Sequence, residues 1–134
     1  MRKALLPLLL ISTLTGANAL AQQEPDTDVF NGKWDVRIQP EAGKPQTARL
    51  LIVNFGGTWT TTSLLGNPKT RACIGKKVPV TVQVSQAAAL EFTAWGAQVS
   101  PACPDLTVVL KPVSEKVLEG TLGTGETIRL TRPR

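Results

Sequence analysis

Three tryptophans have the residue type and surroundings that best suit contact with a ligand. Trp34, Trp59 and Trp95 each lie within two residues of a glycine. An aromatic face can stack on a sugar ring or a flat apolar molecule, and nearby hydroxyl groups can supply hydrogen bonds. Threonine hydroxyls are available at positions 60, 61, 62, 81 and 93. The candidate ligand-binding residues are therefore Trp59, Trp95, Thr60, Thr62, Thr81 and Thr93.

Packing is the alternative role for each tryptophan. Trp34 shares its alternation with Val36 and Ile38, which favours a buried, structural position at one end of a barrel. Trp59 and Trp95 are out of phase with their strongest apolar neighbours. For these two, the pattern leaves packing and ligand contact both open.

The residue types on which most enzymes depend are missing from the chain. It has no histidine and no tyrosine, and its single methionine is Met1. The usual general base and the usual zinc ligand are therefore absent. The ten acidic residues form no paired-carboxylate motif of the kind that a glycosidase needs. We expect no catalytic residue, no metal site and no cofactor.

Residues 1–21 have the pattern of a cleaved signal peptide. A positively charged start precedes an apolar segment, 4–14, that is too short to span a bilayer. Ala19-Leu20-Ala21 then supplies the small-x-small cleavage motif. We expect an exported protein, periplasmic or secreted, with no membrane span in its mature form. A retained signal anchor is the alternative.

The charge of the chain does not favour a nucleic-acid partner. Removing Arg2 and Lys3 with the leader lowers the formal net charge of +5 by two. The remaining positive residues are scattered, with no run longer than Lys76-Lys77. A single-strand groove needs a basic track with aromatic stacking partners, and the chain has only three Trp and three Phe.

Two cysteines bracket a predicted hairpin. Alternating runs at 78–85 and 90–95 flank a small-residue turn, and Ala88 lies midway between Cys73 and Cys103. Folding at this turn brings the two thiols together, and an even cysteine pair in an exported chain predicts a disulfide. Its loop closure would stabilise the fold by about 3–4 kcal/mol. The segment after Trp95 would then be held to the barrel by this bond.

The hairpin also has a predicted register. Pairing about a Ser85–Ala89 turn places opposed residues at positions whose numbers sum to an even value. The even-numbered valines 78–84 then share the inner face with Leu90, Phe92 and Ala94. The outer face carries Thr81, Gln83, Thr93 and Trp95.

About eight short strands account for residues 30–134, after a flexible N-terminal segment at 22–29. No segment shows convincing helical periodicity, and the apolar run at 48–55 suggests a strand with burial on both faces. Gly56-Gly57 is expected to form the next hairpin turn. We predict a small all-β, antiparallel up-and-down barrel. It is favoured over a sandwich because a barrel has no edge strand and the chain shows little edge protection.

The start of the first predicted strand resembles a known family. Gly32-Lys33-Trp34 is similar to the G-x-W opening of calycin barrels, the lipocalins and avidins. In those families a basic residue of the last strand packs across this tryptophan. The resemblance implies that role for Arg132, whose parity matches Ile128 and Leu130. The chain lacks the tyrosine of avidins and the Ser-Gly-x-x-Tyr element of periplasmic lysozyme inhibitors, which disfavours those two activities.

Three functions are compatible with this pattern. The first is a non-enzymatic protein that binds a small molecule or saccharide at an open barrel end. The second is a periplasmic protein-interaction module, such as an inhibitor or immunity protein, that contacts an envelope protein through loops 40–46, 64–70 and 96–104. The third is a structural component of the cell envelope.

Overall fold

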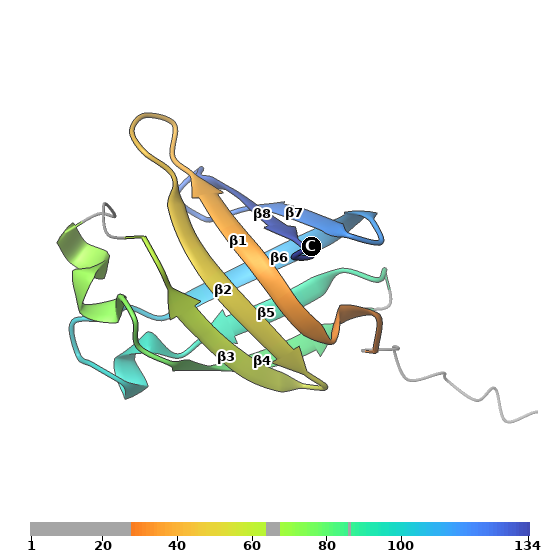
Figure 1. Cartoon of the computed structure of the whole chain (residues 1–134), viewed down its shortest axis with the longest axis horizontal. Coiled ribbons are helices and arrows are strands. Elements are labelled where there is room, and N and C mark those ends of the chain that lie inside the picture. Colours follow the sequence, from red (N-terminus) through yellow and green to blue (C-terminus); the bar gives the residue numbers. More distant parts are fainter. Residues whose placement is uncertain (1–27, 64–67, 86) are drawn as a thin grey trace, which may run out of the picture.

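Eight antiparallel strands close into one barrel in the computed structural model, which describes residues 28–63, 68–85 and 87–134 (Figure 1). Each strand pairs with the next one in the chain, and β8 pairs back with β1, so these strands leave no free edge. The predicted up-and-down barrel is confirmed. The strands are β1 (Gly32–Gln39), β2 (Gln46–Val53), β3 (Gly56–Thr61), β4 (Val78–Val84), β5 (Leu90–Ala94), β6 (Leu106–Ser114), β7 (Val117–Thr121) and β8 (Thr127–Thr131).

Several predicted segments lie outside the described residues. These are the signal peptide 1–21, positions 22–27 of the N-terminal segment, and positions 64–67 of the predicted loop 64–70. The described chain begins with a short 3-10 helix, η1 (Asp28–Phe30), so regular structure starts two residues before the predicted domain boundary. Phe30 belongs to the hydrophobic core.

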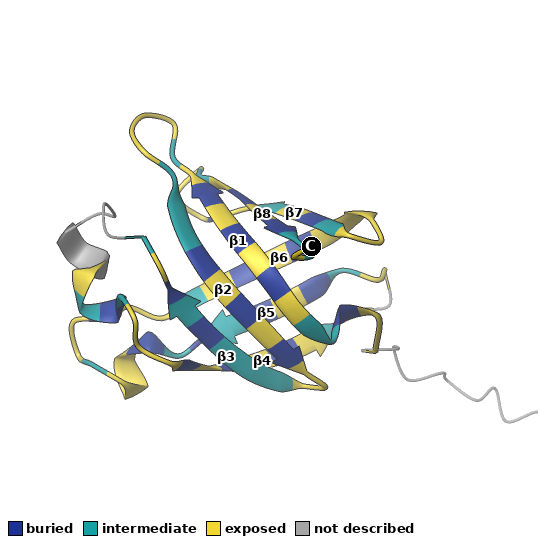
Figure 2. Cartoon of the chain, in the orientation of Figure 1, coloured by how far each residue is buried: buried dark blue, intermediate teal, exposed yellow. Residues whose placement is uncertain are grey.

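Side chains alternate between the barrel interior and its surface. Strand β1 buries Trp34, Val36 and Ile38 and exposes the residues between them (Figure 2). Strand β2 follows the same pattern, although its centre is apolar throughout. Leu51 and Val53 remain 39% and 57% exposed. The expectation of burial on both faces is therefore wrong, because a small closed barrel has one inner face and no further layer covers its wall here.

The β2–β3 hairpin turns earlier than expected. Its two turn residues are Asn54 and Phe55, whereas Gly56 and Gly57 begin β3. Asn54 adopts a φ of +58°, and its backbone N–H donates to the side-chain oxygen of Asn31 at 2.7 Å. Asparagine tolerates this left-handed conformation better than most residues. The prediction of a Gly56-Gly57 turn is corrected accordingly.

The β4–β5 hairpin has the predicted register. Val80 lies opposite Ala94, and Val84 lies opposite Leu90. The turn is closed by the Ser85 N–H, which donates to the Ala89 carbonyl at 2.9 Å. The valine face points inward and the threonine face outward, as parity requires.

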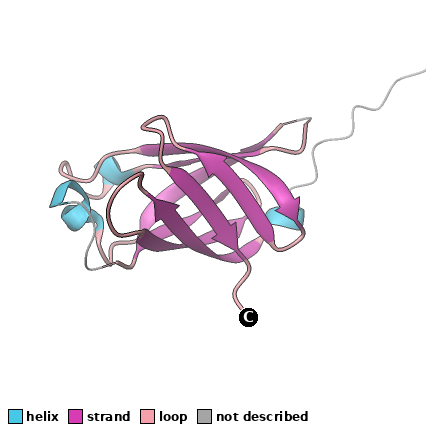
Figure 3. Ribbon diagram, turned by 90° about the horizontal axis from the view of Figure 1, so that it is seen from above, coloured by secondary structure: helices cyan, strands magenta, loops and turns pink. Residues whose placement is uncertain are grey.

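The connections gather at two ends of the barrel. We call the first the Trp34 end, because it contains that residue together with η1 and the β2–β3 turn. The second is the disulfide end, which carries the loops after β1, β3, β5 and β7 and two 3-10 helices, η2 (Pro68–Cys73) and η3 (Gly96–Gln98) (Figure 3). No helix in the described ranges has the length and apolar character needed to cross a membrane.

Candidate functional site

The Trp34 end of the barrel is filled by side chains. The Trp34 ring is 1% exposed, and its indole N–H donates to the Phe30 carbonyl at 2.8 Å. The guanidinium carbon of Arg132 lies 3.8 Å from the centroid of the same ring. This is a cation–π contact. The predicted packing of Arg132 across Trp34 is therefore confirmed.

Arg132 also holds the beginning of the described chain. Its Nη1 donates to the Asn31 carbonyl at 2.7 Å, and its Nη2 donates to the Val29 carbonyl at 2.9 Å. Desolvation by burial lowers the pKa of the Arg132 guanidinium below its ordinary value. Gly32 has a φ of +111°, and a Cβ there would lie 2.8 Å from Arg132 Nη1. The positive φ favours glycine two residues before the tryptophan, and a side chain there would also displace Arg132. This end acts as a structural plug.

The disulfide end contains a cavity of about 320 Å³. This volume lies at the lower end of the range for small-molecule sites, which is about 300–1,000 Å³. The cavity forms where strand ends and their loops meet above the hydrophobic core. Its apolar lining includes Ile38, Trp59, Val78, Ala94, Leu106, Leu122 and the disulfide.

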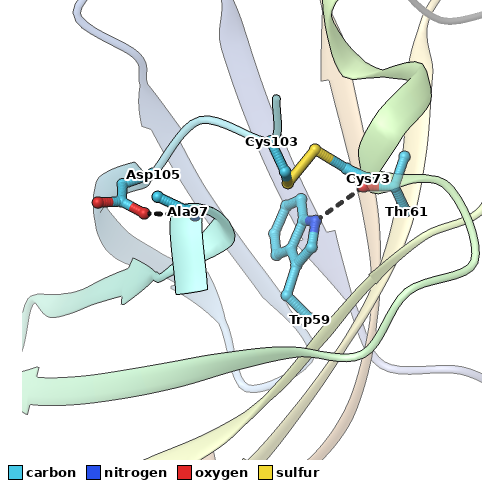
Figure 4. Close-up of a disulfide and its surroundings, with 6 residues drawn as sticks. All are labelled: Trp59, Thr61, Cys73, Ala97, Cys103 and Asp105. Atoms are coloured by element: carbon cyan, nitrogen blue, oxygen red, sulfur yellow. Dashed lines mark hydrogen bonds between the residues drawn. A yellow bond between two sulfur atoms is a disulfide. The ribbon is translucent and has the colours of Figure 1, made fainter. Parts of the chain in front are cut away.

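Trp59 brings an aromatic ring from β3 to this cavity, beside the disulfide (Figure 4). Its indole N–H donates to the Thr61 hydroxyl oxygen at 3.1 Å. Its ring lies 5.7 Å from that of Phe92, centroid to centroid, at an interplanar angle of 32°. These two contacts fix the ring, which is only 4% exposed.

The β2–β3 register explains why Trp59 faces inward. Leu50 is the pairing partner of Trp59, and the two-residue turn makes opposed positions sum to an odd number. Odd-numbered residues of β3 therefore share the interior with even-numbered residues of β2. Within β3 the inward positions are Trp59 and Thr61. Placing Trp59 in or out thus depended on which face of β2 is buried, and the apolar run at 48–55 left that open.

The Cys73–Cys103 disulfide forms part of the cavity wall, and the prediction of this bond is confirmed. It joins the end of η2 to the loop after η3, with the two Cα atoms 5.3 Å apart. Both cysteines are buried. A Cβ on Gly96 would lie 2.6 Å from Cys103 Sγ and 2.5 Å from the Pro104 carbonyl oxygen. The loop therefore packs against the bond so closely that only glycine fits.

Polar groups at the cavity come from several elements. The Asp105 carboxylate accepts the backbone N–H of Ala97 at 3.0 Å, which ties η3 to the chain just before β6 (Figure 4). Thr61 is 2% exposed and lines the cavity, and its oxygen already accepts the Trp59 N–H. Gln46 and Glu126 are half-buried parts of the lining. This arrangement is a mostly apolar chamber with a few polar contacts, the composition typical of ligand pockets.

The predicted ligand-binding residues do not converge on one site. Only Trp59 lines the cavity. Trp95, Thr81 and Thr93 lie on the outer face of β4 and β5, where the Trp95 indole N–H donates to the Thr81 hydroxyl at 3.1 Å. The separation follows from parity, since these residues alternate with the inward valines and Phe92.

The remaining two candidates also lie outside the cavity. Thr60 lines a separate pocket of about 480 Å³ on the outer wall formed by β1, β2 and β3. The exposed Thr62 shares a hydrogen bond of 3.0 Å with the Thr47 hydroxyl. The candidate set therefore divides between the interior and two regions of the surface.

Five polar residues of the cavity, Gln46, Asp105, Thr107, Thr124 and Glu126, were not predicted from the sequence. Gln46, Asp105 and Glu126 each sit at or next to the beginning of a strand, and no motif connects them. Thr61 was recognised as a possible hydroxyl partner but not placed in the site. Within the described ranges, no group of three or more His, Cys, Asp or Glu residues could hold a metal ion.

Comparisons with known proteins give no named relative. No protein-family model and no curated protein matches the chain. A solved structure of a redesigned β-barrel is similar, with 14% sequence identity and a TM-score of 0.49. The match covers 79% of this chain and 93% of the redesigned barrel.

Proposed function

We propose that this chain is an exported, non-enzymatic, calycin-like protein that binds a small molecule in the disulfide-end cavity. The single observation that carries the proposal is the cavity itself, about 320 Å³ and lined by Trp59 and the disulfide. The contrast with the plugged Trp34 end supports it, because packing fills one end of the barrel while the other end keeps space for a ligand. The Arg132–Trp34 contact supports the calycin assignment.

The composition of the site favours binding over catalysis. The chain has no histidine, and both of its cysteines are joined in the disulfide. A thiolate nucleophile and the commonest general base are thus missing. The disulfide also supports a periplasmic or secreted location, because such bonds persist in oxidising compartments.

Tryptophan fluorescence can test the proposal directly. We would titrate a panel of small apolar and amphipathic molecules and short saccharides into the wild type, Trp59→Phe and Trp95→Phe. A ligand in the cavity should shift the emission of the wild type and of Trp95→Phe, but leave Trp59→Phe nearly unchanged. It should also raise the unfolding temperature, because it binds only the folded state. A panel that changes neither emission nor unfolding temperature would contradict the proposal.

A protein partner is the second candidate function, and loop geometry favours it. The predicted interaction loops 40–46 and 96–104 both lie at the disulfide end, as do the described residues of loop 64–70. Loops held together on a rigid scaffold often carry the residues that bind a partner. Capture of a single stoichiometric protein from an envelope extract, with no response to the small-molecule panel, would favour this function over the first.

A further inference from the structure

The charged groups of the cavity are all of one sign. The full sequence has a formal net charge of +5, yet the described lining contains Asp105 and Glu126 and no lysine or arginine. Four basic residues with described side chains, Lys44, Arg71, Lys76 and Lys77, belong to η2 or to loops at the same end but do not line the cavity. The cavity is therefore locally acidic in a protein that is basic overall.

The two carboxylates differ in how far they are already engaged. The Asp105 carboxylate accepts the Ala97 backbone N–H at 3.0 Å, so part of its hydrogen-bonding capacity is already used within the fold. The half-buried Glu126 side chain makes no hydrogen bond and no ion pair with any described residue. It is thus free to accept hydrogen bonds from a ligand. Glu41 of the β1–β2 loop adds a third carboxylate nearby, since a Cβ on Gly125 would lie 3.4 Å from its Oε1.

The rest of the lining defines what such a ligand must look like. Trp59, Leu106 and Leu122 offer apolar contact and cannot solvate a charge. The volume corresponds to about ten water molecules at about 30 Å³ each, which limits the ligand to a small molecule. An electron-rich indole face also attracts cations. An anionic ligand would have to be desolvated beside like charges, which is strongly unfavourable.

The positive charge of the whole protein does not reverse this preference. At physiological ionic strength the Debye length is about 8 Å, so distant exposed charges are largely screened. The half-buried Glu126 is screened less than an exposed group, so its charge acts more strongly on a bound ligand than that of the exposed Asp105. The local carboxylates therefore decide the sign of a bound ligand.

We infer that the cavity selects a small amine, with its ammonium group at Glu126 and an apolar or aromatic body against Trp59. This inference rests on the proposed function and specifies the ligand class for the same site. Glu126 acts as the principal hydrogen-bond acceptor for the cation, and the Thr61 hydroxyl lies deeper, beside the Trp59 indole.

Three probes of similar shape and different charge test the inference. They are 2-phenylethylamine, 2-phenylethanol and 3-phenylpropionate, titrated into the full mature protein and followed by tryptophan emission and calorimetry. The amine should bind about tenfold or more tightly than the alcohol, and the carboxylate should bind most weakly, since a charge-assisted hydrogen bond is worth about a tenfold change in affinity or more.

Two matched variants locate the effect. Glu126→Gln should weaken amine binding about fivefold or more while leaving the alcohol almost unchanged, because it removes the charge and keeps the shape. Glu91→Gln is the control, as Glu91 lies on the outer face of β5 and away from the cavity. It should alter neither affinity. Far-ultraviolet circular dichroism and unfolding temperature establish that both variants are folded.

The outcomes separate the inference from the function on which it rests. If the alcohol or the carboxylate binds as tightly as the amine, the cavity binds ligands and the amine inference is overturned. If Glu126→Gln and Glu91→Gln weaken amine binding equally, Glu126 is not the acceptor and the inference is overturned as well. If none of the three probes binds at millimolar concentration, the result contradicts both the amine inference and the proposed small-molecule site.

Discussion

The two ends of the barrel each contain a buried tryptophan, but they use it differently. At the Trp34 end, a long cationic side chain covers the ring, and the indole N–H bonds to a backbone carbonyl. At the disulfide end, the Trp59 N–H bonds to a side-chain hydroxyl, and the ring borders a cavity. One end is completed by packing from the last strand. At the disulfide end, a covalent bond joins η2 to the loop after η3 and leaves the neighbouring cavity unfilled.

The two ends are stabilised by different kinds of contact. Arg132 contacts Trp34 and two backbone carbonyls at once, so the plug links the start of β1 to the residue that follows β8. The disulfide links η2 to the loop after η3 and forms part of the cavity wall without filling the cavity. We therefore expect changes at the Trp34 end to affect mainly unfolding, and changes at the disulfide end to affect both unfolding and ligand affinity.

The largest effect should come from Trp34→Ala. Removing a fully buried indole leaves a cavity and strips Arg132 of its stacking partner, which should lower the free energy of unfolding by about 3–5 kcal/mol. Urea denaturation followed by circular dichroism measures the change. Trp95→Ala is the matched control, because Trp95 lies half-exposed on the outer wall, and it should cost about 1 kcal/mol or less. Equal losses in the two variants would show that Trp34 is not a plug.

Removal of the disulfide should have the next largest effect. The double variant Cys73→Ala, Cys103→Ala should lose about 3 kcal/mol of stability, since the bond closes a loop with a sequence separation of 30. It should also weaken any ligand of the cavity, because the bond forms part of its wall. Urea denaturation and calorimetric titration measure the two quantities, and reduction of the wild type should reproduce both. A double variant that loses stability but keeps its ligand affinity would restrict the bond to a folding role.

A smaller effect is expected from Thr61→Val. This change keeps the shape of the side chain but leaves the buried Trp59 N–H without its acceptor, which should cost about 1–2 kcal/mol. It should also alter the emission spectrum of Trp59. Thr62→Val is the control, since the exposed Thr62 hydroxyl bonds to the Thr47 hydroxyl and neither residue lines the cavity, so its loss should cost about 0.5 kcal/mol or less. Indistinguishable unfolding curves and spectra for the two variants would contradict the orienting role of Thr61.

Much of the fold could be predicted because its signals are local. The register of the β4–β5 hairpin follows from the period of two and the position of its turn, and the same turn brings Cys73 and Cys103 together. The contact of Arg132 with Trp34 agrees with the resemblance of the G-x-W segment to calycin barrels. The β2–β3 turn was misplaced because a glycine pair is a strong turn signal, yet Asn54 adopts the left-handed conformation instead.

The site was harder to predict because its residues share no local pattern. Trp59, Thr61, Asp105 and Glu126 come from three different parts of the chain, and they line one cavity only after the barrel has closed. The candidate threonines at positions 81 and 93 looked equally suitable in the sequence. Their strands carry them to the outer wall, where Trp95 and Thr81 bond to each other.

Local patterns in the sequence were enough to predict which strand side chains point inward in the β4–β5 hairpin, that the two cysteines pair, and that Trp34 is buried at the start of β1. Each of these depends on spacing within a short segment, which a period of two or a single turn controls. The tertiary structure alone decided that Trp59 faces inward and that one end of the barrel stays hollow. Those features depend on which face of the apolar strand β2 is buried and on which side chains meet across a closed sheet, and contacts of that kind exist only once distant strands have paired.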